Sequence, residues 1–328
     1  MDEDGFRDFL ARRKLKDETV QAHIRLAREF EAFLKKNDRN KDLGKATPRD
    51  MDIFVALLMK DGQNTEDNLI ALARYAFFTD NRGVAVALLE IIDGSQVLQN
   101  LSDKVKQMVG KSKHKEIFEG IELPPLGTHS RDKPKTTKKV MERLEAKLDE
   151  KTCREALSSG LHGPIPDEVF LPDRGKFRKS KSLDDFLRKR HEEYVSELEE
   201  HMNNKTLYFT QEIDKEVVKY VRDTPTCQNG IKEGDVIIVT KIPYMAKKYL
   251  HEKDPRMKRY YACHCAWVRE AIKTDTRISP NFCYCSAGFE KRPWDVIFGQ
   301  PVKADVIETV LKGDMTCKFA IHIPKEFW

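Results

Sequence analysis

Cysteines are the residues of this chain whose type and spacing point most directly to chemistry. Five of the seven lie within residues 263–317, as Cys263-His264-Cys265, Cys283-Tyr284-Cys285 and Cys317. Thiols gathered in this way favour metal binding over disulfides when the chain carries no secretory features. Thiolates are soft ligands, and two pairs suit a tetrahedral zinc ion or, as the less favoured alternative, an iron–sulfur cluster. The competing interpretation is that these cysteines are small buried hydrophobic residues.

Local conformation decides which of these thiols can share one ion. Residues i and i+2 face the same side of an extended segment, which lets Cys263 and Cys265 act together and turns His264 away from them. On a helix the same two positions are about 200° apart, because each residue advances the helix by about 100°. We expect a helix over residues 282–298, and only one of Cys283 and Cys285 can then be a ligand.

Other residues are candidates for the metal site or for nucleophilic chemistry. Cys227 lies in a turn-rich sequence over residues 224–230, and Cys153 and His162 lie on an expected helix and the loop after it. A thiol beside an imidazole is the usual arrangement of a cysteine hydrolase. Cys227, Cys153 and His162, together with Cys283, therefore form a second group of candidate metal or thiol-site residues.

Composition limits the class of protein. The chain has 328 residues, of which 40% are hydrophobic and 34% charged, so it can form real cores. The start Met1-Asp2-Glu3-Asp4 has no basic region followed by an apolar one, so we expect no secretory signal. No apolar run reaches about 18 residues, so we expect no membrane partner. These features predict a cytoplasmic protein with reduced cysteines.

The elements that must position these residues fall into two groups. Residues 1–110 show helical periodicity throughout, with a helix start at Thr47-Pro48-Arg49-Asp50. Residues 111–139, rich in lysine and proline, indicate a basic linker. Residues 140–328 include a β-branched run at 236–239 and a hairpin around Gly313-Asp314. The sequence thus predicts a multidomain protein with an all-α N-terminal helical bundle and an α+β C-terminal domain containing an antiparallel sheet.

The N-terminal region resembles the SAM-like core-binding domain of tyrosine recombinases. The resemblance lies in Phe6-Arg7-Asp8-Phe9-Leu10, Phe30-Glu31-Ala32-Phe33-Leu34, the helix start at Thr47 and the run 68–75. It implies DNA binding, but the recombinase His-x-x-Arg pair occurs nowhere in the chain, so an active recombinase is not expected. Residues 1–110 hold 18 Lys and Arg against 19 Asp and Glu, a net charge of −1. Nucleic acid is therefore a partner that the sequence allows but does not favour.

The C-terminal region resembles the four-vinyl-reductase domain and the L-2-amino-thiazoline-4-carboxylate hydrolase family, with the wider heme-NO-binding and TRAPP-like fold. The motifs are Cys285-Ser286-Ala287-Gly288-Phe289, Gly299-Gln300-Pro301-Val302 and Gly313-Asp314-x-x-Cys317-x-Phe319. The resemblance implies a helical layer on a twisted antiparallel sheet that encloses a small-molecule pocket. It also implies cysteine-bound zinc, with Cys285 and Cys317 at the matching positions.

These observations give one set of predicted sites. The metal ligands are Cys263, Cys265, Cys285 and Cys317, and the ligand pocket is lined by Tyr244, Tyr261, Trp267 and Phe289. Lys241 and Arg259 lie in sequence beside the two tyrosines, which fits either an anionic ligand or the edge of a core.

We therefore predict a small-molecule-binding or sensor protein in which zinc is structural. The alternatives are a hydrolase of the thiazoline-carboxylate type and a DNA-binding regulator that uses the helical domain.

Overall fold

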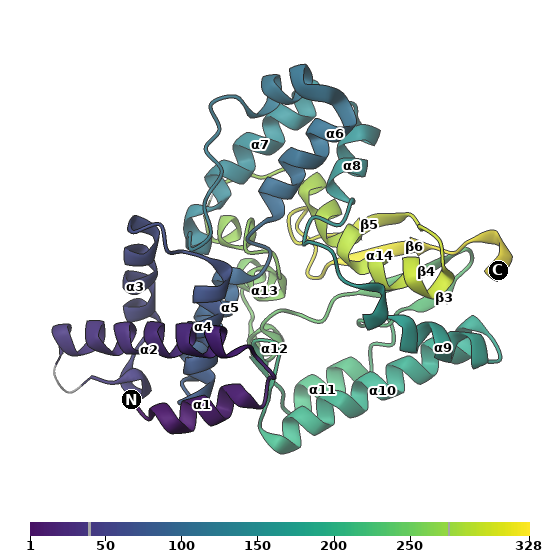
Figure 1. Cartoon of the computed structure of the whole chain (residues 1–328). Helices are drawn as coiled ribbons and strands as arrows, with labels where there is room; N and C mark the ends of the chain where they lie inside the picture. The colour runs from purple at the N-terminus through teal and green to yellow at the C-terminus, as the bar shows by residue number, and fades with distance from the viewer. Residues whose placement is uncertain (39–40, 275) are drawn as a thin grey trace. The chain divides into compact units, whose positions relative to one another are not determined.

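The computed structural model describes residues 1–38, 41–274 and 276–328. It confirms the predicted fold class, because helices occupy the chain up to residue 204 and a mixed region with a four-stranded antiparallel sheet follows (Figure 1). The chain forms two compact units. Unit 1 comprises Met1–Ser95 and Pro124–Asp132, and unit 2 comprises Gln96–Leu123 and Lys133–Trp328.

Unit 1 is a helical bundle, as the periodicity predicts. Its helices are α1 (Glu3–Ala11), α2 (Asp17–Asn37), α3 (Pro48–Lys60), α4 (Glu66–Phe78) and α5 (Arg82–Ile92), with a short 3₁₀ turn at Leu43–Lys45. Each helix turns one apolar stripe inward, and these stripes form a continuous core that includes Phe6, Phe30 and Tyr75. Within this core the hydroxyl of Tyr75 donates to the Glu31 carboxylate at 2.6 Å.

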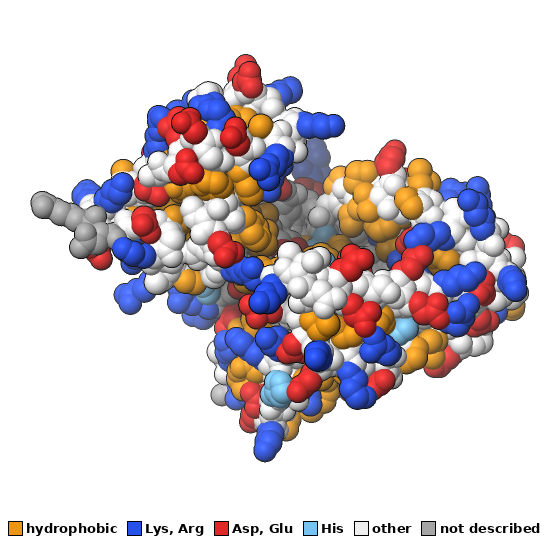
Figure 2. All heavy atoms as spheres, turned by 90° about the horizontal axis from the view of Figure 1, so that it is seen from below, with side chains coloured by type: hydrophobic (Ala, Val, Ile, Leu, Met, Phe, Trp, Pro, Cys, Tyr) orange, Lys and Arg blue, Asp and Glu red, His pale blue; other side chains and the backbone are white. Residues whose placement is uncertain are grey.

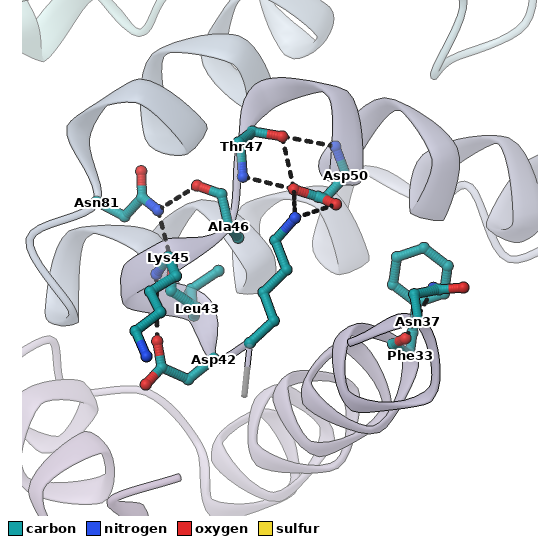
Figure 3. A network of polar contacts seen from close by, with 10 residues as sticks. Phe33, Asn37, Asp42, Leu43, Lys45, Ala46, Thr47, Asp50 and Asn81 are labelled. Atoms are coloured by element: carbon teal, nitrogen blue, oxygen red, sulfur yellow. Dashed lines mark hydrogen bonds and ion pairs between the residues drawn. The ribbon is translucent and has the colours of Figure 1, made fainter. Parts of the chain in front are cut away.

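The start of α3 is fixed by its own sequence. The Thr47 hydroxyl accepts from the Asp50 backbone N–H at 3.3 Å, and an Asp50 carboxylate oxygen accepts from the Thr47 backbone N–H at 2.7 Å (Figure 3). Lys41 lies 2.8 Å from the same carboxylate. Asn81, which caps α5, donates from its side-chain amide to the backbone oxygens of Leu43 and Ala46. These caps satisfy amides that helix ends would otherwise leave without partners.

The predicted boundary at residue 110 and the predicted linker 111–139 overlap helices. Helix α6 (Val97–Phe118) passes through Gly110, where φ is 81° and the helix is interrupted, and α7 (Pro134–Lys147) begins inside the expected linker. Between them, Leu126 belongs to unit 1, where its backbone oxygen accepts from the Asn64 side chain at 2.6 Å. Lysine-rich composition therefore marks the exposed faces of two helices as well as a connection.

Unit 2 begins with helices and ends with the sheet. After α6 and α7 come α8 (Glu150–Leu157), α9 (Leu171–Lys179), α10 (Leu183–Asn204), α11 (Lys215–Arg222), α12 (Ala246–His251), α13 (Pro255–Ala262) and α14 (Tyr284–Phe298). Short strands β1 (Leu207–Tyr208) and β2 (Gln211–Glu212) pair after α10. Short 3₁₀ turns of unit 2 lie at Asp167–Val169, Arg269–Lys273, Pro280–Cys283 and Lys325–Phe327, and the one at Ser130–Asp132 belongs to unit 1.

The four-stranded sheet has the order β3-β4-β6-β5, with every neighbouring pair antiparallel. Its strands are β3 (Ile231–Glu233), β4 (Val236–Thr240), β5 (Ala304–Glu308) and β6 (Lys318–His322). The predicted β-branched strand is β4, and the predicted hairpin is the pair β5–β6. In the loop between them Gly313 has φ 109°, and the Asp314 carboxylate accepts from the Thr309 backbone N–H at 2.8 Å.

Helix α14 contacts the sheet and also approaches α8 closely at Gly288. A Cβ built on Gly288 would lie 2.6 Å from the backbone oxygen of Ser158, at the end of α8. A methyl group cannot occupy that space unless the two backbones move apart. Glycine at this position thus allows α14 and α8 to share the core.

One apolar stretch of the chain passes a length and composition test for crossing a membrane. Arg82–Phe118 is long and apolar enough to span a membrane, but buried helices of soluble proteins pass the same test. Residues from α5 and α6 contribute to the hydrophobic cores of units 1 and 2 respectively. This stretch is therefore weak evidence in either direction.

We expect Gly288→Ala to destabilise unit 2 by about 1–3 kcal/mol, because the added methyl meets the Ser158 backbone. Gly175→Ala in α9 is the matched control, since a Cβ there meets no atom within 4 Å. It should be neutral or stabilising by up to about 1 kcal/mol, as alanine favours helix. Denaturant unfolding followed by tryptophan fluorescence measures unit 2, because Trp267, Trp294 and Trp328 all lie there. Equal effects of the two substitutions would contradict the close approach.

A second prediction concerns the pH dependence of α3. Partial burial raises the pKa of Asp50, but hydrogen bonds from Lys41 and Thr47 outweigh this and leave the pKa lowered. The Asp50 carboxylate therefore stabilises the folded state above its unfolded pKa, near 4, and this contribution is lost as the pH falls through the lower folded pKa. Asp50→Asn should accelerate amide hydrogen exchange in α3 at pH 7 and have little effect near pH 2. A difference from the native protein that persists unchanged at pH 2 would count against a role for the charge.

Candidate functional site

A buried ion pair joins the sheet to α14. Lys241 follows the last residue of β4, and its backbone N–H donates to the Cys317 oxygen at 2.9 Å, which continues the β4–β6 pairing. Its Nζ lies 3.1 Å from Oε1 of Glu290 on α14, and the two side chains are only 10% and 6% exposed. Lys241 shares its sheet face with Val239 and Ile237, which belong to the core.

Three of the four predicted metal ligands and Cys283 are electrostatic neighbours of one another, and one of them, Cys317, also lies near this ion pair. Burial raises the pKa of Cys263, and the thiols of Cys265 and Cys317 raise it further. Burial raises the pKa of Cys283 well above its usual value, and the Cys317 thiol raises it further. A hydrogen bond with Thr309 lowers this pKa in part. The Cys283 sulfur is 2.8 Å from the Thr309 hydroxyl. We call Cys263, Cys265, Cys283 and Cys317 the four interacting thiols.

The predicted ligand Cys285 lies on a different element from Cys283. Cys283 ends the 3₁₀ turn before α14, whereas Cys285 is inside α14 and packs in the main hydrophobic core of unit 2. Helix α14 begins at Tyr284, so most of the helix expected over 282–298 is present, and Cys283 lies in the 3₁₀ turn before it. Cys285 stays a predicted ligand, and Cys283 is an electrostatic neighbour of Cys317, Cys263 and Cys265.

The four interacting thiols do not form a metal centre in this arrangement. Among residues 1–38, 41–274 and 276–328, no group of three or more His, Cys, Asp or Glu side chains is placed to hold a metal ion. The donor type suits zinc, but the positions of the thiols do not. Zinc and the less favoured iron–sulfur cluster therefore stay predictions, which elemental analysis of the purified protein decides.

Protonation argues against a thiolate nucleophile. Burial raises the pKa of Cys153 to about 11 and that of Cys227 to about 12. Burial, with the nearby Lys241 charge, lowers the pKa of His264 to about 3. The neutral His264 ring lies with Nε2 2.6 Å from the Ile242 backbone oxygen, so this nitrogen donates. With raised pKa values the thiols of Cys153 and Cys227 are protonated at neutral pH, and protonated thiols are weak nucleophiles.

The remaining candidates of the second group occupy different places. Cys153 packs in the main core of unit 2, and Cys227 packs in a separate core with Tyr194 and Tyr208. The His162 ring instead lies 5.1 Å from the ring of Phe289, which is 39% exposed.

The four aromatic residues predicted to line a pocket each have neighbours of another kind, and only Trp267 is buried. The Arg269 guanidinium lies 4.4 Å from the ring centre of Tyr244, and the Lys248 ammonium lies 5.7 Å from that of Tyr261. Trp267 is 2% exposed and belongs to the core. Phe289 packs near Lys241, whose Nζ is 5.5 Å from the ring centre.

A cavity of about 770 Å³ lies in unit 2, at a place that the sequence analysis did not identify. It is bordered by α7, α13, the turn Arg269–Lys273, the loop after that turn, and the start of the β5–β6 loop. Its apolar lining includes Met141, Ala271, Ile272, Ile278, Val310 and Leu311. Its charged lining consists of Lys138, Glu142, Glu145, Arg256, Arg259 and Arg277.

Only part of this cavity leaves a signal in the sequence. Asp254-Pro255 is a helix start, and Arg256 and Arg259 follow one turn apart on the same face of α13. Arg259 was noted as a neighbour of Tyr261, but nothing local connects it to Arg277 or to α7. Comparison with known proteins adds no further guide, because no family model, curated protein or solved structure matches the chain. Both family resemblances therefore stay predictions.

We expect removal of one member of the buried ion pair to be costly. Glu290→Leu leaves the Lys241 charge buried without its carboxylate and should lower the free energy of unfolding by about 3–5 kcal/mol. The double variant Lys241→Met/Glu290→Leu should lose much less, because neither charge remains buried. Urea unfolding of both variants, followed by tryptophan fluorescence, checks this. A double variant as unstable as the single one would show that the charges are not the cause.

Proposed function

We propose that unit 2 binds a small molecule in the cavity of about 770 Å³ bordered by α7 and α13. The observation that carries the proposal is the combination of this volume with a mixed lining. Pockets for small ligands measure roughly 300–1,000 Å³ and combine apolar walls with a few polar groups. Met141, Ile272 and Ile278 supply apolar wall here, and Ser279 and Thr276 supply hydroxyl groups.

Packing and hydrogen bonds hold the walls of the cavity in place. Ile278 and Val310 are otherwise buried in the main core of unit 2, so their exposed edges are held by packing. Ser279 and the Asn281 side chain both donate to the Glu145 carboxylate, which ties the loop before α14 to α7. A pocket built on packed elements loses little conformational entropy when a ligand binds.

The alternative functions receive less support. The buried, protonated thiols do not favour a cysteine hydrolase. On the face shown in Figure 2, Lys and Arg side chains are interspersed with Asp and Glu, whereas duplex DNA binding relies on gathered positive charge. Small-molecule binding is therefore the function that the geometry supports best.

A blocking substitution tests the proposal. We expect ligand-observed NMR with a fragment library of aromatic acids, phosphate esters, amines and neutral aromatics to find binders to the full chain. Thr276→Trp, which places an indole at the cavity wall, should abolish their binding. Asn203→Trp is the control, because it adds the same ring at an exposed position of α10.

Two results would overturn the proposal. One is the absence of any binder in the library. The other is binding that survives Thr276→Trp, which would place the ligand elsewhere. Circular dichroism of both variants establishes that they are folded.

A further inference from the structure

We infer that the ligand of this cavity is an organic anion whose carboxylate or phosphate group is bound by Arg259 and Arg277. The inference rests on the proposed function and narrows it to one class of ligand. Two observations carry it. One is which of the charged side chains that line the cavity have ion-pair or hydrogen-bond partners, and the other is the apolar surface beside them.

The Arg259 guanidinium has no carboxylate partner among the described residues. Its Nη1 and Nε both contact backbone oxygens, those of Val310 and Pro255, at 3.4 Å. Several other arginines of unit 2 pair with carboxylates, as Arg190 does with Asp173 at 3.1 Å. Arg259 is half-buried at the cavity and keeps its positive charge, because arginine is not deprotonated in proteins.

Arg277 supplies a second uncompensated charge. It lies in the loop between the turn Arg269–Lys273 and α14 and makes no hydrogen bond or ion pair with the part of the chain that the structure describes. Two guanidinium groups from separate elements thus border one cavity. Arginine binds carboxylate and phosphate through paired N–H groups, which gives both affinity and orientation.

The acidic residues of the cavity already have partners. Glu142 lies 3.6 Å from Lys138 on the same helix. The Glu145 carboxylate accepts from Ser279 and, at 2.7 Å, from the Asn281 amide. Among the described residues neither carboxylate forms an ion pair with Arg259 or Arg277, and the lining holds four basic side chains against two acidic ones, so the cavity favours an anion.

The apolar part of the lining indicates that the anion carries a hydrophobic body. Val310 is 1% exposed, and Arg259 contacts its backbone oxygen. Ile272 and Ile278, which are also buried, border the same space. An inorganic anion would leave this surface in water, whereas an attached apolar group would cover it.

Isothermal titration calorimetry of the full chain tests the inference with defined probes. The probes are 3-phenylpropanoate, its neutral analogue 3-phenylpropanol, phenyl phosphate and inorganic phosphate. We expect at least one organic anion to bind about tenfold or more tighter than the alcohol, because hydrogen bonds to charged groups are the strong ones. Comparison of the carboxylate with the phosphate ester identifies which oxyanion the site prefers.

Substitutions then assign the charge to the two arginines. Arg259→Gln and Arg277→Gln should each weaken binding of the organic anion by about tenfold and leave that of the alcohol unchanged. Arg178→Gln, at an exposed position of α9 away from the cavity, should change neither. Arg277 is exposed in a loop, so its variant keeps the inference testable if Arg259→Gln fails to fold.

The possible failures are distinguishable. If acid and alcohol bind equally, the arginine variants change nothing and Thr276→Trp abolishes both, the charge inference is wrong and the proposed function stands. If inorganic phosphate binds as tightly as phenyl phosphate, the inference that the anion carries a hydrophobic body is wrong. If no probe binds and the fragment library also yields no binder, the proposed function fails as well.

Discussion

The ion pair between Lys241 and Glu290 fixes the part of unit 2 on which the other sites depend. Its two charges are almost fully buried, and each would destabilise the fold by several kcal/mol without the other. The pair therefore holds α14 in one position along the end of β4. In that position Gly288 meets Ser158 of α8, and Cys283 meets Thr309 after β5. The β5–β6 loop that begins at Thr309 continues into Val310, which borders the cavity.

Features encoded within a few residues of sequence could be predicted. The start of α3 follows from Thr47, Pro48 and Asp50, because the hydrogen bonds between Thr47 and Asp50 and the proline at the first helical position need no other part of the chain. The β5–β6 hairpin likewise follows from Gly313 and Asp314, because the turn makes its own backbone and side-chain contacts. The linker prediction failed over part of its length for the opposite reason. Lysines and a proline suggest a loop by composition, but Pro134 is a favourable first residue for α7, and Val140 and Leu144 anchor that helix in the core.

Features that need distant segments could not be predicted. The place of Cys283 beside Cys263, Cys265 and Cys317 depends on how distant segments pack, and no local pattern encodes it. Trp267 looked available for a ligand because aromatic residues near cysteines and cations are common in pockets. Its backbone oxygen instead accepts from Thr137 of α7, and its ring is enclosed in the core. The cavity combines α7, α13 and the β5–β6 loop, which no sequence pattern connects.

The interacting thiols and the cavity share one element, the β5–β6 loop. The Thr309 hydroxyl contacts the Cys283 sulfur at 2.8 Å and accepts from the Leu311 backbone N–H at 3.3 Å. Arg259 reaches the next carbonyl, that of Val310, from the cavity side. The thiols thus support the loop from the core while the arginine contacts it from the cavity. Because the loop is held on both sides, the thiols contribute to the cavity through packing. This arrangement explains how a cysteine-rich sequence and a cavity with no cysteine in its lining occur in one domain.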